Sequence, residues 1–371
     1  MAGMKKRTHG PSLYYASDKN VFDALNQHKV DTPTVVKLFQ RRNIVVSKKT
    51  PRDDLAKYFS TLTHDYYDHK EIAGRLGVAV RRERTTSMDV AGVGDTDELH
   101  GVVEQLKKEM EANGDTVQVK RDGDNITIRV QYSEVDYKRS EFSQVQVRDG
   151  SIEFVKSDTG YVVRNTQNDY LNGVRETLLA KVEKATSEPL TKLVVALFDI
   201  PSAKLRSKFF HELATSLPSF VRRDVTDVYV FKAKPEADND GEEGSDSNDG
   251  SETHVEKVFL RGSGVSRSEI LNGLLDEEDY YIVKMGWTAT EILGEGNVYD
   301  IEAAFTDFKD CTGFSFILSG VFPLEEGRIS TKRRSPYKHE TDALSRVIES
   351  KARDLVAELR TEFLATEARS D

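Results

Sequence analysis

Positively charged side chains are concentrated in one short stretch near the start of the chain. Lysine or arginine occupies seven of the 21 positions from residue 37 to residue 57: Lys37, Arg41, Arg42, Lys48, Lys49, Arg52 and Lys57. Such side chains bind nucleic-acid phosphates and release condensed counterions, so the affinity they provide falls steeply with salt. The stretch therefore predicts a surface that binds nucleic acid, DNA in the first place. The alternative is a basic surface that is merely solvated or that docks a protein.

A second basic cluster lies near the other end of the chain, in the sequence STKRRSPYKH. Lys332, Arg333 and Arg334 follow a predicted strand and precede a long predicted helix. We include these three among the candidate nucleic-acid-binding residues, because they could line a groove beside the strand. The alternative is a loop whose charges are solvated.

The net charge of −10 conceals an uneven distribution. Residues 1–90 hold 17 lysines and arginines against 10 acidic residues, whereas residues 91–371 hold the remaining 36 against 53. Eight of these acidic residues fall within 236–252, a segment without lysine or arginine. The positive field that attracts phosphate is thus predicted at the N-terminal end of the chain.

Motifs for catalysis or metal binding are scarce. The chain has no Walker A loop, no dinucleotide fingerprint, no nucleophile elbow and no His-Glu-x-x-His sequence. In the run from His64 to His69, each histidine lies four residues from an aspartate, but the two pairs would point in different directions. We therefore expect polar surface residues there, with Tyr66 and Tyr67 packed, and we predict neither a metal nor a cofactor.

A metal-dependent nuclease is the enzymatic alternative. Its site would need carboxylates and a lysine around a pair of strands, to hold the ion and activate water. Two sets of residues could be arranged in this way: Asp124, Asp136 and Lys138, and Asp300, Glu302, Asp307 and Lys309. We expect both sets to be charges at strand edges and turns, so no catalytic residue is assigned.

Three short helices are predicted between Ser17 and Leu62. Asp31 or Thr32 is expected to cap one that has Pro33 at its start, and Thr50 to cap another that begins at Pro51. Between them, residues 44–46 are β-branched and are predicted to be extended. The amide groups at both helix starts would favour phosphate.

Over residues 31–62, this order of capped helix, extended basic segment and second capped helix resembles the SAP and LEM type of helix-extended-helix domain. For the SAP members the resemblance implies DNA binding through the basic second half, whereas LEM-type relatives bind proteins. The resemblance covers about a tenth of the chain, and the glycine common in the extended turn is missing.

The remainder of the chain alternates between helical and strand periodicity. Helices are predicted around residues 99–110, 171–182, 205–217, 266–275 and 344–363, with Ser266 and Glu269 forming a capping box. Hairpin turns are predicted at 122–125 and at Asp149-Gly150. The apolar run 193–200 is predicted to be a strand buried on both faces, joined through a helix to strand 228–233 as a βαβ unit.

The predicted fold class is α+β, with a small N-terminal helical module followed by a mixed, largely antiparallel sheet body and flanking helices. We expect a tail at 1–16, a basic helical module at 17–90 and α+β subdomains at 91–190 and 191–371. The acidic segment 236–252 is predicted to be disordered, as either a loop or a linker.

Cysteine content and hydropathy indicate where the protein acts. The single cysteine, Cys311, excludes an intramolecular disulfide framework and favours a reducing compartment, the cytoplasm. No apolar run reaches the roughly 18–20 residues that span a bilayer, so no membrane partner is predicted.

The sequence favours a nucleic-acid-binding accessory protein, of the kind found in prokaryotic defence or mobile-element systems. The alternatives are the metal-dependent nuclease and an adaptor that binds a protein partner, or itself, without binding nucleic acid.

Overall fold

The computed structural model describes residues 16–28, 30–76, 83–138, 142, 144–233, 255–276, 279–294 and 296–368. The expected tail, except Ala16, and the acidic segment 236–252 lie outside the described residues. The chain divides into two compact units, each built from several stretches of sequence. The first unit comprises 1–82, 94–153 and 175–186, and the second comprises 83–93, 154–174 and 187–371. Helices together with a largely antiparallel arrangement of strands confirm the α+β fold class.

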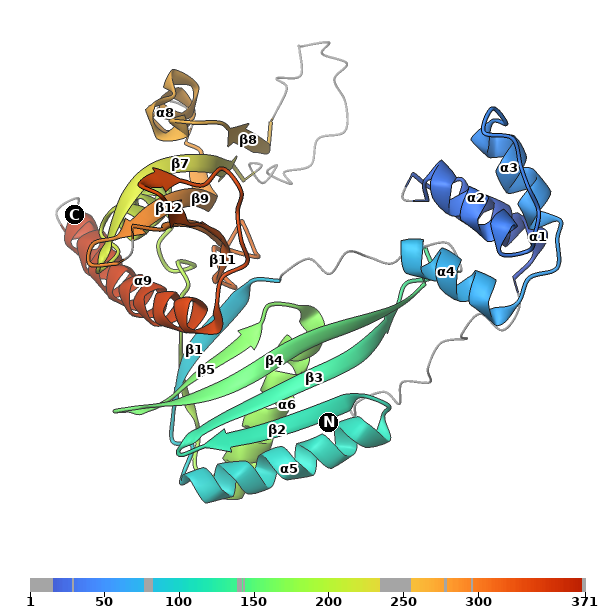
Figure 1. Ribbon diagram of the computed structural model, residues 1–371. Coiled ribbons are helices and arrows are strands. Elements are labelled where there is room, and N and C mark those ends of the chain that lie inside the picture. The colour runs from blue at the N-terminus through green and yellow to red at the C-terminus, as the bar shows by residue number, and fades with distance from the viewer. Residues whose placement is uncertain are drawn as a thin grey trace, which may run out of the picture. The chain divides into compact units, whose positions relative to one another are not determined.

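Four short helices form what we call the helical module, residues 16–76 of the first unit (Figure 1). They are α1 (Asp18–Leu25), α2 (Thr32–Gln40), α3 (Arg52–Ser60) and α4 (Tyr66–Leu76). Their apolar residues recur at helical spacing and meet in one small core, which includes Val21, Leu25, Leu38, Phe39, Phe59 and Ile72. The three helices predicted from the sequence are confirmed, and α4 is an addition.

Only one of the two predicted helix caps forms. Asp31 caps α2, and its side chain accepts a hydrogen bond from the Thr34 backbone N–H at 3.0 Å. The prediction that Thr50 caps α3 is wrong: Pro51 is the N-cap residue, and it supplies no side-chain hydrogen bond. Asp53 and Asp54 lie in the first turn of α3, where their charges interact favourably with the helix dipole.

The rest of the first unit contains α5 (Thr96–Ala112), β2 (Thr116–Asp122) and β3 (Asn125–Val135). Asp122 pairs with Asn125 across a two-residue turn, in which Gly123 has a φ of 60°. This left-handed conformation is one that glycine adopts without steric cost, and the predicted hairpin is confirmed.

The turn predicted at Asp149-Gly150 is wrong. A single strand, β4 (Val145–Ser157), runs straight through both residues and keeps its extended backbone. The chain reverses later, at Asp158 and Thr159, before β5 (Gly160–Thr166) and α6 (Asp169–Thr186). Turn-forming residue types did not produce a turn here because Gly150 does not adopt the positive φ that a tight hairpin requires.

The second unit is built around antiparallel strands in the order β5-β1-β11-β10-β9-β7-β8, with β6 also pairing with β1. Its further elements are β1 (Thr85–Ala91), β6 (Thr191–Val194), α7 (Ala203–Thr215), β7 (Phe220–Phe231), β8 (Lys257–Arg261), α8 (Glu269–Asp276), β9 (Tyr281–Glu291), β10 (Val298–Ala304), β11 (Ser315–Phe322), the small hairpin β12 (Leu324–Glu325) and β13 (Arg328–Ile329), and α9 (Lys338–Glu367).

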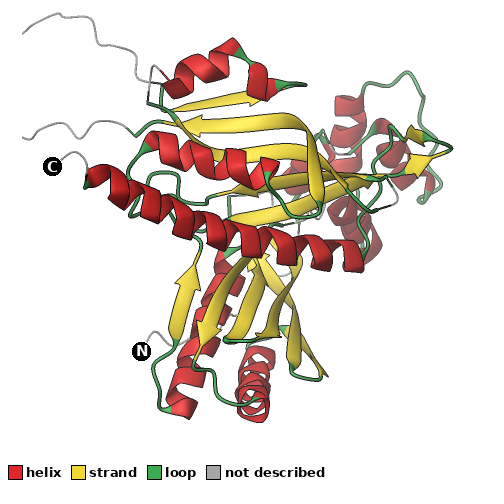
Figure 2. Ribbon diagram, turned by 90° about the vertical axis from the view of Figure 1, so that its left-hand side faces the viewer, coloured by secondary structure: helices red, strands yellow, loops and turns green. Residues whose placement is uncertain are grey.

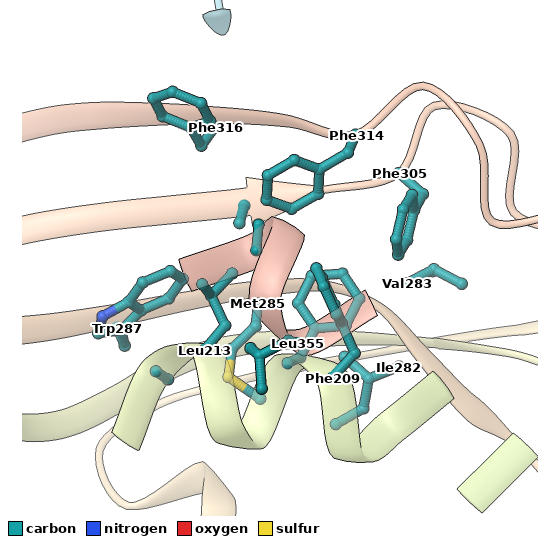
Figure 3. Packing of buried hydrophobic residues seen from close by; sticks show 14 of the residues in the cluster. Phe209, Leu213, Ile282, Val283, Met285, Trp287, Phe305, Phe314, Phe316 and Leu355 are labelled. Carbon is teal, nitrogen blue, oxygen red and sulfur yellow. The ribbon is translucent and has the colours of Figure 1, made fainter. Parts of the chain in front are cut away.

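Helices α7 and α9 pack against each other and against the sheet of the second unit (Figure 2). Figure 3 shows Phe209 and Leu213 of α7 and Leu355 of α9 beside Met285 and Trp287 of β9. All five side chains are buried, and each buried side chain of this size contributes about 1.5–3 kcal/mol through the hydrophobic effect. This packing fixes the sheet that carries the C-terminal candidate residues.

The apolar run 193–200 is not a doubly buried strand. β6 ends at Val194 with all four of its residues exposed, and Phe198 is also exposed. Leu197 and Ile200 do enter the core, but on an irregular segment whose Leu197 N–H donates to the Cys311 carbonyl at 3.0 Å. The predicted βαβ unit is wrong as well, because β6 pairs with β1 whereas β7 pairs with β8 and β9, all antiparallel.

The capping box predicted from Ser266 and Glu269 does not form. Ser266 lies in a short 3-10 turn, Val265–Arg267, and α8 begins only at Glu269. The preceding Gly264 has a φ of 69°, and its N–H donates to the Asp224 carboxylate at 3.0 Å. That side-chain acceptor fixes the loop, so the helix starts one turn later than the sequence pattern suggested.

The longest helix, α9, has 30 residues, and its charged side chains recur along its whole length. In the described part of the chain, no helix combines the length and the apolar character needed to cross a bilayer.

One buried ion pair of the second unit makes a testable prediction. Arg164 of β5 donates to both Glu349 carboxylate oxygens of α9 at 2.6 Å, with side chains 8% and 2% exposed. Because Glu349→Ala leaves the guanidinium buried without its counterion, we expect it to lower the free energy of unfolding by about 3–5 kcal/mol. Urea unfolding followed by the fluorescence of Trp287, which is buried in the same unit, measures this loss.

Arg353→Ala is the matched control, because it breaks a more exposed α9 pair, Arg353 with Asp89, both 25% exposed. We expect it to cost at most about 1 kcal/mol. Equal losses for the two variants would contradict a special role for the buried pair.

Candidate nucleic-acid interface

The helix that the sequence did not predict, α4, presents several polar and charged residues along one face. Tyr67, Lys70, Glu71, Gly74 and Arg75 are spaced three, four, seven and eight residues from the first, which places them on the same side of a helix. Together with Lys37 of α2 and Arg41, the C-cap residue of that helix, they line a hollow of about 650 Å³. We call this hollow the α2–α4 groove.

The groove is positively charged. It contains four cationic side chains and one carboxylate, that of Glu71. Lys37 Nζ and Arg75 Nε lie 3.6 and 3.8 Å from the same Glu71 oxygen, Oε1, which is too far for strong hydrogen bonds. For Arg41 and Lys70, the described residues provide no ion pair. An anionic ligand would therefore meet an excess of positive charge.

Exposed tyrosines adjoin these charges. Tyr66 and Tyr67 are 70% and 62% exposed and contact each other edge to face at 5.6 Å between ring centroids. The prediction that they pack inside the module is wrong, because the core side of α4 is formed by Ile72 and Leu76. An exposed ring beside cations provides a surface on which a base can stack.

An ion pair between half-buried Arg42 and buried Asp68 holds α4 next to α2. The Arg42 guanidinium donates to Oδ2 of Asp68, whose side chain is only 4% exposed, and it also lies 5.2 Å from the Phe59 ring centroid. The first turn of α4 is fixed further by Asp65, whose carboxylate accepts the Asp68 N–H at 2.8 Å, and this hydrogen bond lowers the pKa of Asp65. Arg42 is thus a structural residue.

The other predicted basic residues of the module differ in their roles. Arg52 is structural, since it donates to the Leu25 carbonyl at 2.7 Å and to the Gln27 carbonyl, which fixes α3 to the end of α1. Lys48, Lys49 and Lys57 are exposed and lie outside the groove lining. Of the seven predicted residues, the structure therefore places Lys37 and Arg41 in the groove.

The starts of α2 and α3 both carry carboxylates, but only the one at α2 binds the helix amides. The Asp31 carboxylate accepts both the hydroxyl and the N–H of Thr34, and these hydrogen bonds lower the pKa of Asp31. Asp53 and Asp54 place negative charge in the first turn of α3. At α2 the Asp31 carboxylate occupies the position expected for phosphate, so the expectation is wrong there. At α3 no side chain caps the amides, and the expectation stays a prediction that the charges of Asp53 and Asp54 oppose.

The second basic cluster is largely neutralised by neighbouring acids. Arg333 pairs with Asp300, and Arg334 makes two hydrogen bonds to Glu340 at 2.8 and 2.6 Å. Lys332 alone of the three predicted residues has no acidic partner among the described residues. This cluster offers far less free positive charge than the α2–α4 groove.

The carboxylates considered for a nuclease are separated or already paired. Asp124 and Asp136 flank the two ends of β3, which at about 3.3 Å per residue separates them by more than about 30 Å. Glu302 receives Lys284 at 2.6 Å and Arg84 at 2.7 Å, and Asp300 pairs with Arg333. Over the described residues, no three potential metal-binding side chains gather at one point.

No protein-family model matches the chain, and a comparison with curated proteins finds no match either. The roles of the groove residues therefore rest on their chemistry and geometry.

His64, which lies next to Asp68, makes the stability of the module depend on pH. Burial lowers the pKa of His64 below its ordinary value of 6.5, and its Nδ1 lies 3.8 Å from the Asp68 carboxylate. The folded state therefore binds a proton at His64 less readily than the unfolded state does. The free energy of unfolding is fully present above pH 6.5, and it falls as the pH is lowered from 6.5 to the pKa of His64 in the folded protein. We expect an NMR titration of the His64 ring to give a pKa below 6.5.

His64→Gln should reduce the difference between the unfolding free energies at about pH 7.5 and about pH 5.5. Some of the difference should persist, because burial also lowers the pKa of His211, in the second unit. An unchanged difference in the variant, or a His64 pKa above 6.5, would contradict this account.

Proposed function

We propose that the protein binds nucleic acid through the α2–α4 groove. The observation that carries this proposal is the combination of four cations, one carboxylate and an exposed tyrosine around a single hollow. Cations provide the salt-dependent attraction to phosphates, and an aromatic face provides stacking that tolerates any base. The net negative charge of the chain does not oppose this binding, since a local field depends on nearby charges within about 10 Å in salt solution.

We also propose that residues 31–62 form a domain of the SAP and LEM type. This similarity fits DNA binding, as in SAP domains, and equally fits protein binding, as in LEM domains. Helices α2 and α3 flank residues 44–47, which belong to no helix or strand. The groove, however, uses α4 in place of α3, so we propose a binding surface beyond the segment that shows the similarity. We further propose that the protein acts in the cytoplasm, where the single, buried Cys311 would stay reduced.

The proposal predicts salt-dependent binding that depends on the groove. We expect Arg41→Ala combined with Lys70→Ala to weaken binding of a labelled oligonucleotide of about 20 nucleotides roughly tenfold at about 50 mM salt. The slope of log affinity against log salt should become shallower by about 0.7–0.9 for each phosphate that the variant no longer binds. Fluorescence anisotropy at several salt concentrations, with single-stranded and duplex probes, measures both quantities.

Lys19→Gln provides the control for charge. Lys19 lies on α1, outside the groove lining, and pairs with Asp23 on the same helix at 2.5 Å. We expect this variant to bind like the unmodified protein. The proposal would be refuted by an absence of binding at low salt, or by equal effects of the groove variant and the control. Capture of an acidic protein by the same groove would favour the adaptor alternative.

A further inference from the structure

We propose that the α2–α4 groove holds an unpaired base of a single-stranded nucleic acid, and that Glu71 selects guanine by accepting hydrogen bonds from its base-pairing edge. This inference rests on the proposed function, since it concerns the same groove. It adds a specific ligand, a single-stranded segment that contains guanine, and a specific residue that distinguishes it from other single strands.

The face of α4 inside the groove has the shape for a flat ring. Tyr67, Glu71 and Gly74 follow one another along this face at intervals of four and three residues. A Cβ atom added at Gly74 would meet no heavy atom within 4 Å, so the helix surface there is open. The exposed Tyr67 ring lies about two turns away, on the other side of Glu71. A base that stacks on Tyr67 can therefore reach the Glu71 carboxylate above an unobstructed surface.

A carboxylate is unexpected in a groove that binds only phosphates. Glu71 would repel each phosphate nearby, and its side chain is 28% exposed, so it is available to a ligand. Its two cationic neighbours both approach Oε1, whereas the described residues provide no hydrogen bond to Oε2. An ionised carboxylate accepts hydrogen bonds and donates none. Glu71 is thus suited to a ligand group that presents N–H donors.

Guanine presents the best match among the bases. Its base-pairing edge carries two adjacent N–H donors, N1–H and the N2 amino group, which a carboxylate can accept together. Adenine and cytosine offer one amino group beside an acceptor nitrogen, and thymine and uracil offer one N–H between two carbonyl oxygens that a carboxylate repels. In a duplex this edge is already paired, so recognition requires a single strand.

The four cations are arranged to hold the backbone around such a base. Lys37 of α2 and Arg41, the C-cap of that helix, lie about one turn apart. Lys70 and Arg75 lie on α4, so positive charge borders the hollow from both sides. The hollow, about 650 Å³, falls in the range of about 300–1,000 Å³ that is usual for small-ligand sites. One nucleotide fits within it, with its neighbouring phosphates at the rim.

The experiment compares thymine-only single-stranded DNA with the same oligonucleotide carrying one central guanine or one central inosine, which lacks the N2 amino group. We expect the full-length protein to bind the guanine probe about tenfold more tightly than the thymine probe, with inosine between them. RNA probes in a uracil background show whether the sugar matters. Glu71→Gln should remove most of the preference for guanine and also tighten binding of the thymine probe, because the repulsion of phosphates is lost.

Two further variants separate selection from charge. Asp23→Asn, on α1, removes one negative charge outside the groove and should keep the preference for guanine. Gly74→Leu adds a side chain to the open surface, and it should weaken binding of every single-stranded probe, because each base is displaced. Leucine favours helices more than glycine does, so loss of folding is not expected.

The outcomes distinguish this inference from the proposed function. Binding that is weakened by Arg41→Ala and Lys70→Ala but is equal for the guanine and thymine probes would refute guanine selection alone. A guanine preference that survives Glu71→Gln would refute the role of Glu71. Failure of the full-length protein to bind any probe at low salt would refute the proposed function itself.

Discussion

The Arg42 guanidinium and the Asp68 carboxylate form the contact on which the α2–α4 groove depends. The Asp68 side chain is 4% exposed, and a charge in that setting is stable only with its partner in place. The pair fixes the end of α2 beside the first turn of α4. Lys37 and Arg41 precede Arg42 along the chain, and Lys70 and Glu71 follow Asp68, so both groups are brought to the same hollow. One pair of opposite charges thereby offsets the repulsion between several like charges held close together.

Local sequence signals predicted the elements whose formation depends on local interactions. The Asp31 cap, the turn around Gly123 and the apolar periodicity of α9 all act within a few residues, and each is present in the structure. Local signals were not always sufficient, since the Thr50 cap, the Ser266–Glu269 capping box and the turn at Asp149-Gly150 did not form. Other wrong predictions depended on distant partners. The run 193–200 has the composition of a central strand, but only its first two residues join a strand, β6, which pairs with β1, and the remainder follows the contour of the core. Composition indicated that part of the run is buried, but not which residues are buried or which strand pairs with it.

For the proposed groove, the sequence pointed to residues at α2 but not to those on α4. Clustering in sequence predicted Lys37 and Arg41, but it equally included Arg42 and Arg52, whose donors are used within the module. A list of charges cannot distinguish these roles, because internal pairing depends on how helices meet. The α4 residues were missed because a helix with few apolar residues gives a weak periodic signal. The spacing of Tyr67, Glu71 and Gly74 is the pattern that could have revealed its outer face.

The position of β1 in the second unit has a consequence for how the protein folds during synthesis. β1 pairs with β5 and with β11. Its residue Thr85 pairs with Phe316 of β11, which follows about 230 residues later in the chain. At about 5–20 residues per second, the ribosome needs about 10–50 s to produce that partner. The helical module, whose contacts are mostly short in sequence, is complete long before then. β1 therefore leaves the ribosome with both edges unpaired, and the end of β1 at Thr85 still lacks its β11 partner after β5 and β6 have been made. This interval is when the nascent chain is most exposed to incorrect strand pairing.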